Sequence, residues 1–84
     1  MYKPLVTVHL WSGLRSLVGK EAVEVRASNV GQMLAALERE HPALADAIDL
    51  GVSVSIDGKI YAFGLTEKVD ETKEIYLLQR ITGG

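Results

Sequence analysis

The chain has 84 residues, of which 48% are hydrophobic and 24% are charged, and this composition excludes a disordered chain. Its formal net charge of −2, with both signs mixed along the sequence, gives no reason to expect nucleic acid as a partner. Cysteine is absent, which excludes disulfides and thiolate metal sites, and no apolar run approaches the ~18 residues that span a membrane. We therefore expect a cytoplasmic protein without a membrane partner, with residues 1–84 forming a single domain.

The first third of the chain predicts a β-hairpin. Residues 5–11 and residues 22–27 each alternate between an apolar and a second face, as strands do. The segment 13–19 between them begins and ends with glycine and predicts a turn-like link. Two strands joined by such a link are expected to pair antiparallel.

The middle third predicts one amphipathic helix. Ser28 or Asn29 is a suitable N-cap, and apolar residues then recur at the spacing of one helical face, at Val30, Met33, Leu34 and Leu37. Gly31 is expected to cost roughly 1 kcal/mol relative to alanine if it lies inside this helix. The helix should end near His41, because Pro42 disfavours helical geometry in the residue before it.

The remaining segments predict three further strands, over 52–56, 59–63 and 74–81. A short helical turn closed by Gly51 precedes the first of them, a tight Asp57-Gly58 turn joins the first to the second, and a polar loop over 64–73 joins the second to the third. One helix on one face of a mixed sheet satisfies the two-layer rule for α+β domains.

The sequence ends in Gly83 and Gly84, shortly after the apolar run of the last strand. Glycine has no Cβ, so such an end can enter a channel that is too narrow for other residues. A carboxylate presented in this way can be activated as an acyl-adenylate and can then take up sulfur or an amine. We expect residues 81–84 to form a flexible tail. The alternative is that two glycines stand at this position by chance.

Four segments distributed along almost the whole chain carry motifs of one known family: residues 14–19, 30–34, 54–58 and 75–84. They resemble the MoaD/ThiS family of ubiquitin-like sulfur carriers, and the spacing fits the longer MoaD-like members better. The resemblance implies a ubiquitin-like β-grasp: a mixed sheet of about four to five strands, one main helix on one face, and the first and last strands side by side. Gln79-Arg80 departs from the family pattern, because that place usually holds prolines.

The resemblance also implies that Gly84 carries the chemistry and that Gly83 gives it access. A ubiquitin-activating-type adenylyltransferase, MoeB/ThiF-like, would use ATP to adenylate the Gly84 carboxylate, and a sulfur donor would convert it to a thiocarboxylate. The sulfur would pass to an acceptor enzyme such as the MoaE-like large subunit of molybdopterin synthase. No cofactor or metal is expected on the chain itself. The chain is not expected to be an enzyme alone, although it fits the small subunit of that synthase.

A sheet with one helix leaves its other face uncovered, and we expect partners to bind there. The residues expected on this surface are Trp11, Tyr76 and Leu78, accompanied by His9 and Tyr61 and continued toward the tail by Arg80, Ile81 and Thr82. Tryptophan and tyrosine are frequent anchors in such sites. The alternatives are that Trp11 packs onto the neighbouring loop and that Arg80 is a solvated charge.

Three functional hypotheses stay open at this point. The first is a sulfur carrier, for molybdopterin or instead for thiamine, cysteine or tRNA thiolation. The second is a ubiquitin-like modifier that forms an amide with a target lysine through Gly84. The third is a non-covalent binding module that uses the open face only.

Overall fold

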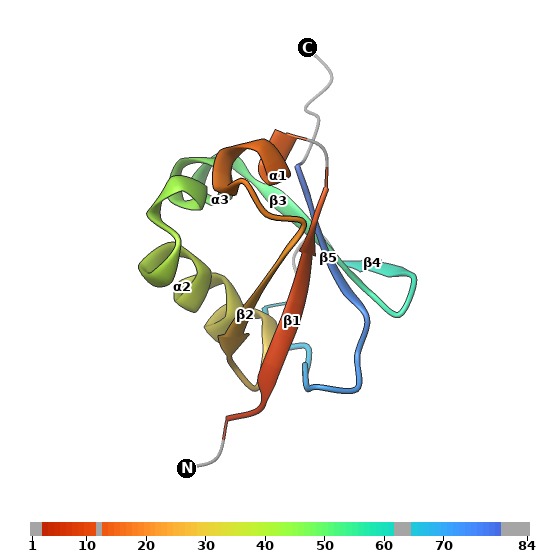
Figure 1. The fold of residues 1–84 in the computed structure, drawn as a ribbon. Helices are drawn as coiled ribbons and strands as arrows, with labels where there is room; N and C mark the ends of the chain where they lie inside the picture. Colours follow the sequence, from red (N-terminus) through yellow and green to blue (C-terminus); the bar gives the residue numbers. More distant parts are fainter. Residues whose placement is uncertain (1–2, 12, 62–64, 80–84) are drawn as a thin grey trace.

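The computed structural model describes residues 3–11, 13–61 and 65–79, which form a mixed sheet with helices packed on one side (Figure 1). The sheet has five strands in the order β2-β1-β5-β3-β4. The elements are β1 (Leu5–Leu10), α1 (Gly13–Val18), β2 (Ala22–Arg26), α2 (Val30–Glu40), the 3₁₀ turn η1 (Pro42–Leu44), α3 (Ala45–Leu50), β3 (Val52–Ile56), β4 (Lys59–Tyr61) and β5 (Ile75–Gln79).

The first and last described strands are neighbours at the centre of the sheet. β1 pairs with β5 in parallel and with β2 in the antiparallel direction, while β3 pairs antiparallel with both β5 and β4. Parallel neighbours require a long crossover, and here that crossover contains the whole segment from β2 to β4. This arrangement confirms the expected adjacency of the two strands and the predicted hairpin of β1 and β2.

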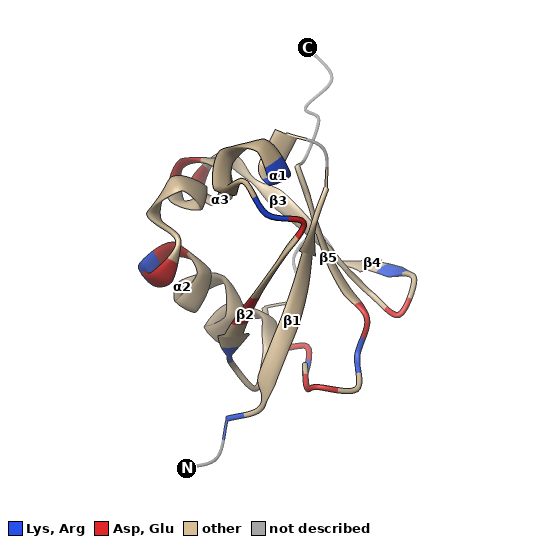
Figure 2. Ribbon diagram, viewed as in Figure 1, with Lys and Arg blue, Asp and Glu red and all other residues tan. Residues whose placement is uncertain are grey.

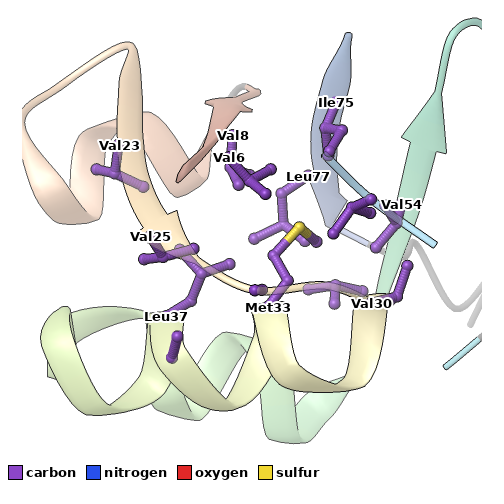
Figure 3. Close-up of a cluster of buried hydrophobic side chains, with 14 of the residues drawn as sticks. Val6, Val8, Val23, Val25, Val30, Met33, Leu37, Val54, Ile75 and Leu77 are labelled. Atoms are coloured by element: carbon purple, nitrogen blue, oxygen red, sulfur yellow. The ribbon is translucent and has the colours of Figure 1, made fainter. Parts of the chain in front are cut away.

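The core lies between the sheet and α2, and it is formed by every second residue of the strands (Figure 3). No polar or charged side chain is buried among the described residues. Figure 3 shows Met33 of α2 reaching toward the sheet among the apolar side chains of β1, β3 and β5. The buried strand residues include Val6, Val8, Leu10, Val23, Val25, Val54, Ile75 and Leu77.

The start of α2 is fixed by a reciprocal cap. The Asn29 Oδ1 accepts the backbone N–H of Gln32 at 2.8 Å, and the Gln32 Oε1 accepts the backbone N–H of Ser28 at 2.9 Å. The Ser28 hydroxyl also donates to the Gln32 Oε1 at 2.7 Å. Three donors that would otherwise lack partners at the helix start are thereby satisfied. Asn29 is therefore the N-cap, and the predicted end of the helix at His41 is also confirmed.

A close backbone contact accounts for the glycine near the start of α2. The Gly31 N–H donates to the carbonyl of Leu65 at 2.8 Å, and the Val30 N–H donates to the carbonyl of Glu67 at 2.9 Å. A Cβ at Gly31 would lie 3.2 Å from the same Leu65 oxygen. The loop after β4 can therefore approach the helix this closely because residue 31 has no side chain.

The segment between the first two strands is a short helix, so the prediction of a turn-like link is wrong. α1 forms because Leu14 is fully buried in the core and its N–H donates to the carbonyl of Trp11 at 3.1 Å. The helix ends at Gly19, which has a φ of 77° and donates to the carbonyl of Arg15 at 2.8 Å. A left-handed glycine is a common helix stop.

The Asp57-Gly58 turn is confirmed, with φ values of 50° and 88° that suit a two-residue hairpin. Asp57 also anchors the start of the last strand, because its Oδ1 accepts the N–H of Glu74 at 2.8 Å. β4 ends at Tyr61 and β5 covers Ile75–Gln79, whereas the predicted strands ran further, to residues 63 and 81. Residues 62, 63, 80 and 81 lie outside the described part of the chain.

Candidate docking face

The face of the sheet opposite the helices carries one row of side chains that crosses all five strands. The pairing registers place its members side by side in the order Ala22, His9, Tyr76, Ser55 and Ile60. Leu78 lies two residues beyond Tyr76 on the same side of β5. Polar and apolar side chains thus share this face, in contrast to the purely apolar face under α2.

A shallow groove of about 410 Å³ occupies the part of this face over β3, β4 and β5. Ser55 lies between Tyr76 and Ile60 because it pairs with Tyr76 on one side and with Ile60 on the other. Its small side chain leaves room between larger neighbours. The other lining residues are Trp11, Gly58 and Leu78. The groove is therefore mainly apolar, and it can accept an apolar side chain of a partner.

Trp11 is exposed to 56% and lines both this groove and a second hollow of about 230 Å³. Its backbone N–H donates to the carbonyl of Leu77 at 3.2 Å, which continues the pairing of β1 with β5. The second hollow is also lined by His9 and Tyr76, whose rings stack with centroids 4.8 Å apart, and by Arg15. The exposure does not fit the alternative in which Trp11 packs onto the neighbouring loop.

Tyr61 does not lie on this face, so its predicted placement is wrong. Tyr61 pairs with Val54 and packs against the core, while the Lys59 ammonium lies 5.4 Å from its ring centroid. Ile60 takes the open position instead, with 64% of its surface exposed. The sequence contained this information, because a two-residue turn at 57–58 fixes the register of the hairpin and places residue 60 opposite Ser55.

The five residues predicted to form the reactive tail and its base lie outside the described part of the chain: Arg80, Ile81, Thr82, Gly83 and Gly84. The last described residue is Gln79, which pairs with Val52 and follows Leu78 directly. The chain therefore leaves β5 next to the groove residue Leu78. The structure brings Trp11, Tyr76 and Leu78 together there, as the sequence predicted for the open face.

None of the residues that line this groove is charged. β1, β5 and β3 contain no Lys, Arg, Asp or Glu, and Figure 2 shows the charges on α2, on β2, on the β3–β4 hairpin and in the loop before β5. Within the described residues, no group of three His, Asp or Glu side chains could hold a metal ion. None of the described helices is both long and apolar enough to cross a membrane.

The parallel pairing of β1 with β5 at the centre of a five-stranded sheet, with α2 across one face, defines the ubiquitin-like β-grasp class. The sequence matches the model of the ThiS family over residues 8–84. The chain therefore belongs to the ThiS family of ubiquitin-like proteins, which confirms the resemblance inferred from its motifs. A comparison with curated protein sequences gave no significant match.

Solved structures of similar fold include archaeal and bacterial proteins. The small archaeal modifier protein 1 (SAMP1) of Methanosarcina acetivorans has a TM-score of 0.82 and 23% identity, with 100% of both chains covered. SAMP1 of Haloferax volcanii has a TM-score of 0.74 and 27% identity, covering 95% of this chain and 99% of that chain. A chain in the complex of subunits 1 and 2 of the molybdopterin-converting factor from Helicobacter pylori 26695 has a TM-score of 0.68 and 18% identity, covering 95% and 99%.

Proposed function

We propose that this protein is a sulfur carrier whose Gly84 carboxylate is converted to a thiocarboxylate. The observation that carries this proposal is the ThiS-family match, which extends through Gly83 and Gly84. The placement of the apolar groove next to the end of β5 supports it, because a partner seated there would be close to the start of the tail. Five residues follow Gln79, from Arg80 to Gly84, and they reach at most about 17 Å when extended.

The chemistry requires activation because a free carboxylate is a poor electrophile. The Gly84 carboxylate oxygen attacks the α-phosphorus of ATP in the partner's site, and pyrophosphate leaves. Hydrosulfide supplied by a sulfur donor then attacks the carbonyl carbon, AMP leaves, and loss of the S–H proton gives the thiocarboxylate. Dividing one difficult substitution into two easier steps is the general advantage of a covalent intermediate. ATP is bound by the activating enzyme, for which a MoeB/ThiF-like adenylyltransferase is the proposed partner.

The open-face groove is the proposed docking site for both the activating enzyme and the sulfur acceptor. Trp11, Tyr76 and Leu78 would provide apolar anchors, and Arg80, Ile81 and Thr82 would lead the chain into the partner's active site. Glycine at positions 83 and 84 would keep the last two residues of the tail free of side chains. Substituting Gly84 by alanine adds a Cβ beside the reacting carbon and should block entry without affecting the fold.

Among the pathways that use such carriers, we propose molybdopterin synthesis, with this chain as the small subunit of the synthase and a MoaE-like large subunit as the acceptor. Support comes from the fold likeness to a chain of the Helicobacter pylori molybdopterin-converting factor complex. The absence of cysteine fits action in the reducing cytoplasm. Thiamine, cysteine and tRNA thiolation are the alternative destinations of the sulfur.

A second candidate function is that of a protein modifier. It is favoured by the 27% identity to SAMP1 of Haloferax volcanii, a protein whose name describes a small archaeal modifier. In that case the same Gly84 acyl-adenylate would react with a lysine amine of a target and form an amide. The fold and the tail serve both functions equally, so the distinction has to come from the product.

Intact-mass spectrometry tests the proposal directly. The protein is incubated with a MoeB/ThiF-like enzyme, ATP and a sulfur donor, and the carrier function predicts a mass gain equal to the replacement of one oxygen by sulfur. Gly84→Ala should lose most of this product, whereas Ser16→Ala, a small change at an exposed position of α1, should retain it. High-mass conjugates in a lysate would instead support the modifier. An unchanged mass with an enzyme that modifies another ThiS-family carrier would overturn both.

A further inference from the structure

The outer edge of β2 presents unused backbone hydrogen-bonding groups. β2 is the edge strand next to β1, and no described segment pairs with its outer side. The Leu10 N–H donates to the carbonyl of Glu21 at 2.8 Å, and the Ala27 N–H donates to the carbonyl of Pro4 at 3.1 Å. Backbone groups alternate in direction along an antiparallel strand, so the odd-numbered residues of β2 face β1. The N–H and C=O groups of the even-numbered residues therefore face outward, at Ala22, Glu24 and Arg26.

A hollow of about 500 Å³ lies along this edge. It lies where α2 ends at Glu40 and the chain turns at Pro42, beside the start of β2. The lining residues come from the strand, from its neighbour and from the end of the helix: Thr7, Lys20, Ala22, Val23, Glu24, Glu40 and His41. The edge thus has both free backbone groups and space beside them.

The side chains of β2 specify what an added strand must carry. Ala22, Glu24 and Arg26 share the open face, and Figure 2 shows the acidic and then the basic position along β2. Directly opposite side chains in an antiparallel pair favour opposite charges and disfavour like charges. An incoming antiparallel strand meets Arg26 first and Ala22 last. Its matching pattern, from N- to C-terminus, is acidic, any, basic, any, large apolar.

We propose that the outer edge of β2 binds an extended segment of a partner protein as a sixth, antiparallel strand with this charge pattern. The large apolar residue opposite the small Ala22 extends toward His9, which is the neighbour of Ala22 across the sheet. The residue opposite Val23 points to the helix side of the sheet, where His41 lines the hollow. Main-chain hydrogen bonds supply affinity and the two charged positions supply selectivity. The proposal does not depend on the chemistry of Gly84.

A second copy of the chain is the main competing occupant. Two β2 strands related by a two-fold axis at Val25 would place Glu24 of each copy opposite Arg26 of the other. That arrangement would put Ser28, which lies directly before the N-cap of α2, opposite Ala22, and it would supply no large apolar residue there. A separate peptide segment satisfies all three outward positions of β2, and for this reason we favour it.

The probe is the peptide acetyl-Ser-Glu-Val-Lys-Thr-Leu-Ser-amide, compared with acetyl-Ser-Lys-Val-Glu-Thr-Leu-Ser-amide, which has the same composition but exchanged charges. Titration into the ¹⁵N-labelled full chain should shift the amide resonances of Ala22, Glu24 and Arg26. The exchanged peptide should bind about tenfold more weakly, because two favourable cross-strand pairs become unfavourable. The double variant Glu24→Lys with Arg26→Glu should invert this preference.

A proline variant separates strand addition from side-chain attraction. Glu24→Pro removes one outward N–H without removing a bond of the β1–β2 ladder, and it should abolish binding, whereas Glu24→Ala keeps that N–H and should weaken binding only about threefold. Equal affinity for the two peptides, or shifts centred on Trp11 and Leu78, would overturn the proposal. Concentration-dependent shifts of the β2 amides without peptide would assign the edge to a second copy and would overturn it as well.

Discussion

Leu77 and Leu78 are adjacent in the sequence but belong to different parts of the molecule. Leu77 is 0% exposed and packs in the core under α2, whereas Leu78 lines the groove on the open face. Every strand in the centre of the sheet divides in this way, because successive side chains point to opposite faces. Hydrophobicity alone therefore does not distinguish a residue that stabilises the fold from one that is available to a partner. The presence of a helix on one face makes the distinction.

The largest effect is expected from truncation on the covered face. Leu77→Ala removes buried methyl groups and leaves a cavity, so it should lower the free energy of unfolding by about 3 kcal/mol. Leu78→Ala should change it by less than about 0.5 kcal/mol, because its side chain is only half-buried on the open face. Urea unfolding followed by the fluorescence of Trp11 measures both values. Similar losses in the two variants would show that the faces are not energetically distinct.

Introducing charge on the open face should change a different quantity, the affinity for a partner and not the free energy of unfolding. Tyr76→Asp combined with Leu78→Asp should weaken binding to the MoeB/ThiF-like enzyme by about 30-fold or more, since each removes an apolar anchor. Leu17→Asp with Leu50→Asp is the matched control, because both leucines are exposed and lie outside the groove. Calorimetry on the four single variants and the two doubles would assign the effect. Equal losses in both doubles would remove the groove from consideration.

The hairpin at the end of the open face allows a smaller and purely local perturbation. Gly58 has a φ of 88°, and a Cβ there would meet no atom within 4 Å. Gly58→Ala should therefore cost about 1 kcal/mol through backbone conformation alone. Because Gly58 borders the groove, the variant should also show how far binding depends on the shape of this turn. A thermal unfolding midpoint equal to that of the parent protein would contradict the backbone argument.

The elements that the sequence predicted well are those whose signals are local. The alternation around Val8, the Asn29 cap and the Asp57-Gly58 turn each depend on interactions within a few residues, and the structure contains all three. The central pairing of β1 with β5 is not a local property, since a period of two does not state which strands are neighbours. It was inferred only from the family resemblance.

The two errors also have physical causes. The sequence predicts a turn where α1 forms, because five residues between two glycines carry only a weak helical signal. The burial of Leu14 in the core stabilises the helix instead. Alternation within residues 59–63 alone does not decide which face Tyr61 occupies; the hairpin register across the 57–58 turn decides it. Of the candidate site, Trp11, Tyr76 and Leu78 could be predicted from alternation. The groove between them also depends on Ser55 lying beside Tyr76, which follows only from the strand order.

The smallest effect is expected between α2 and α3, outside the groove. A side-chain hydrogen bond with Asp49 raises the pKa of Glu38, so protonated Glu38 is favoured in the folded state. A raised folded pKa adds stability at low pH that is lost as the pH rises through that pKa. Between pH 7 and pH 4 this contribution therefore grows in the parent protein.

Glu38→Gln replaces the titrating group by an amide that can donate to Asp49 at every pH. The variant should unfold at a slightly higher temperature than the parent protein at pH 7, and the difference should shrink toward pH 4. Asp70, whose pKa is lowered by hydrogen bonds from Thr72, acts in the opposite direction, but it is common to both proteins and cancels in the difference. Glu71→Gln, an exposed loop substitution, is the control. A difference for Glu38→Gln that does not change with pH would show that the bond to Asp49 contributes nothing to folding.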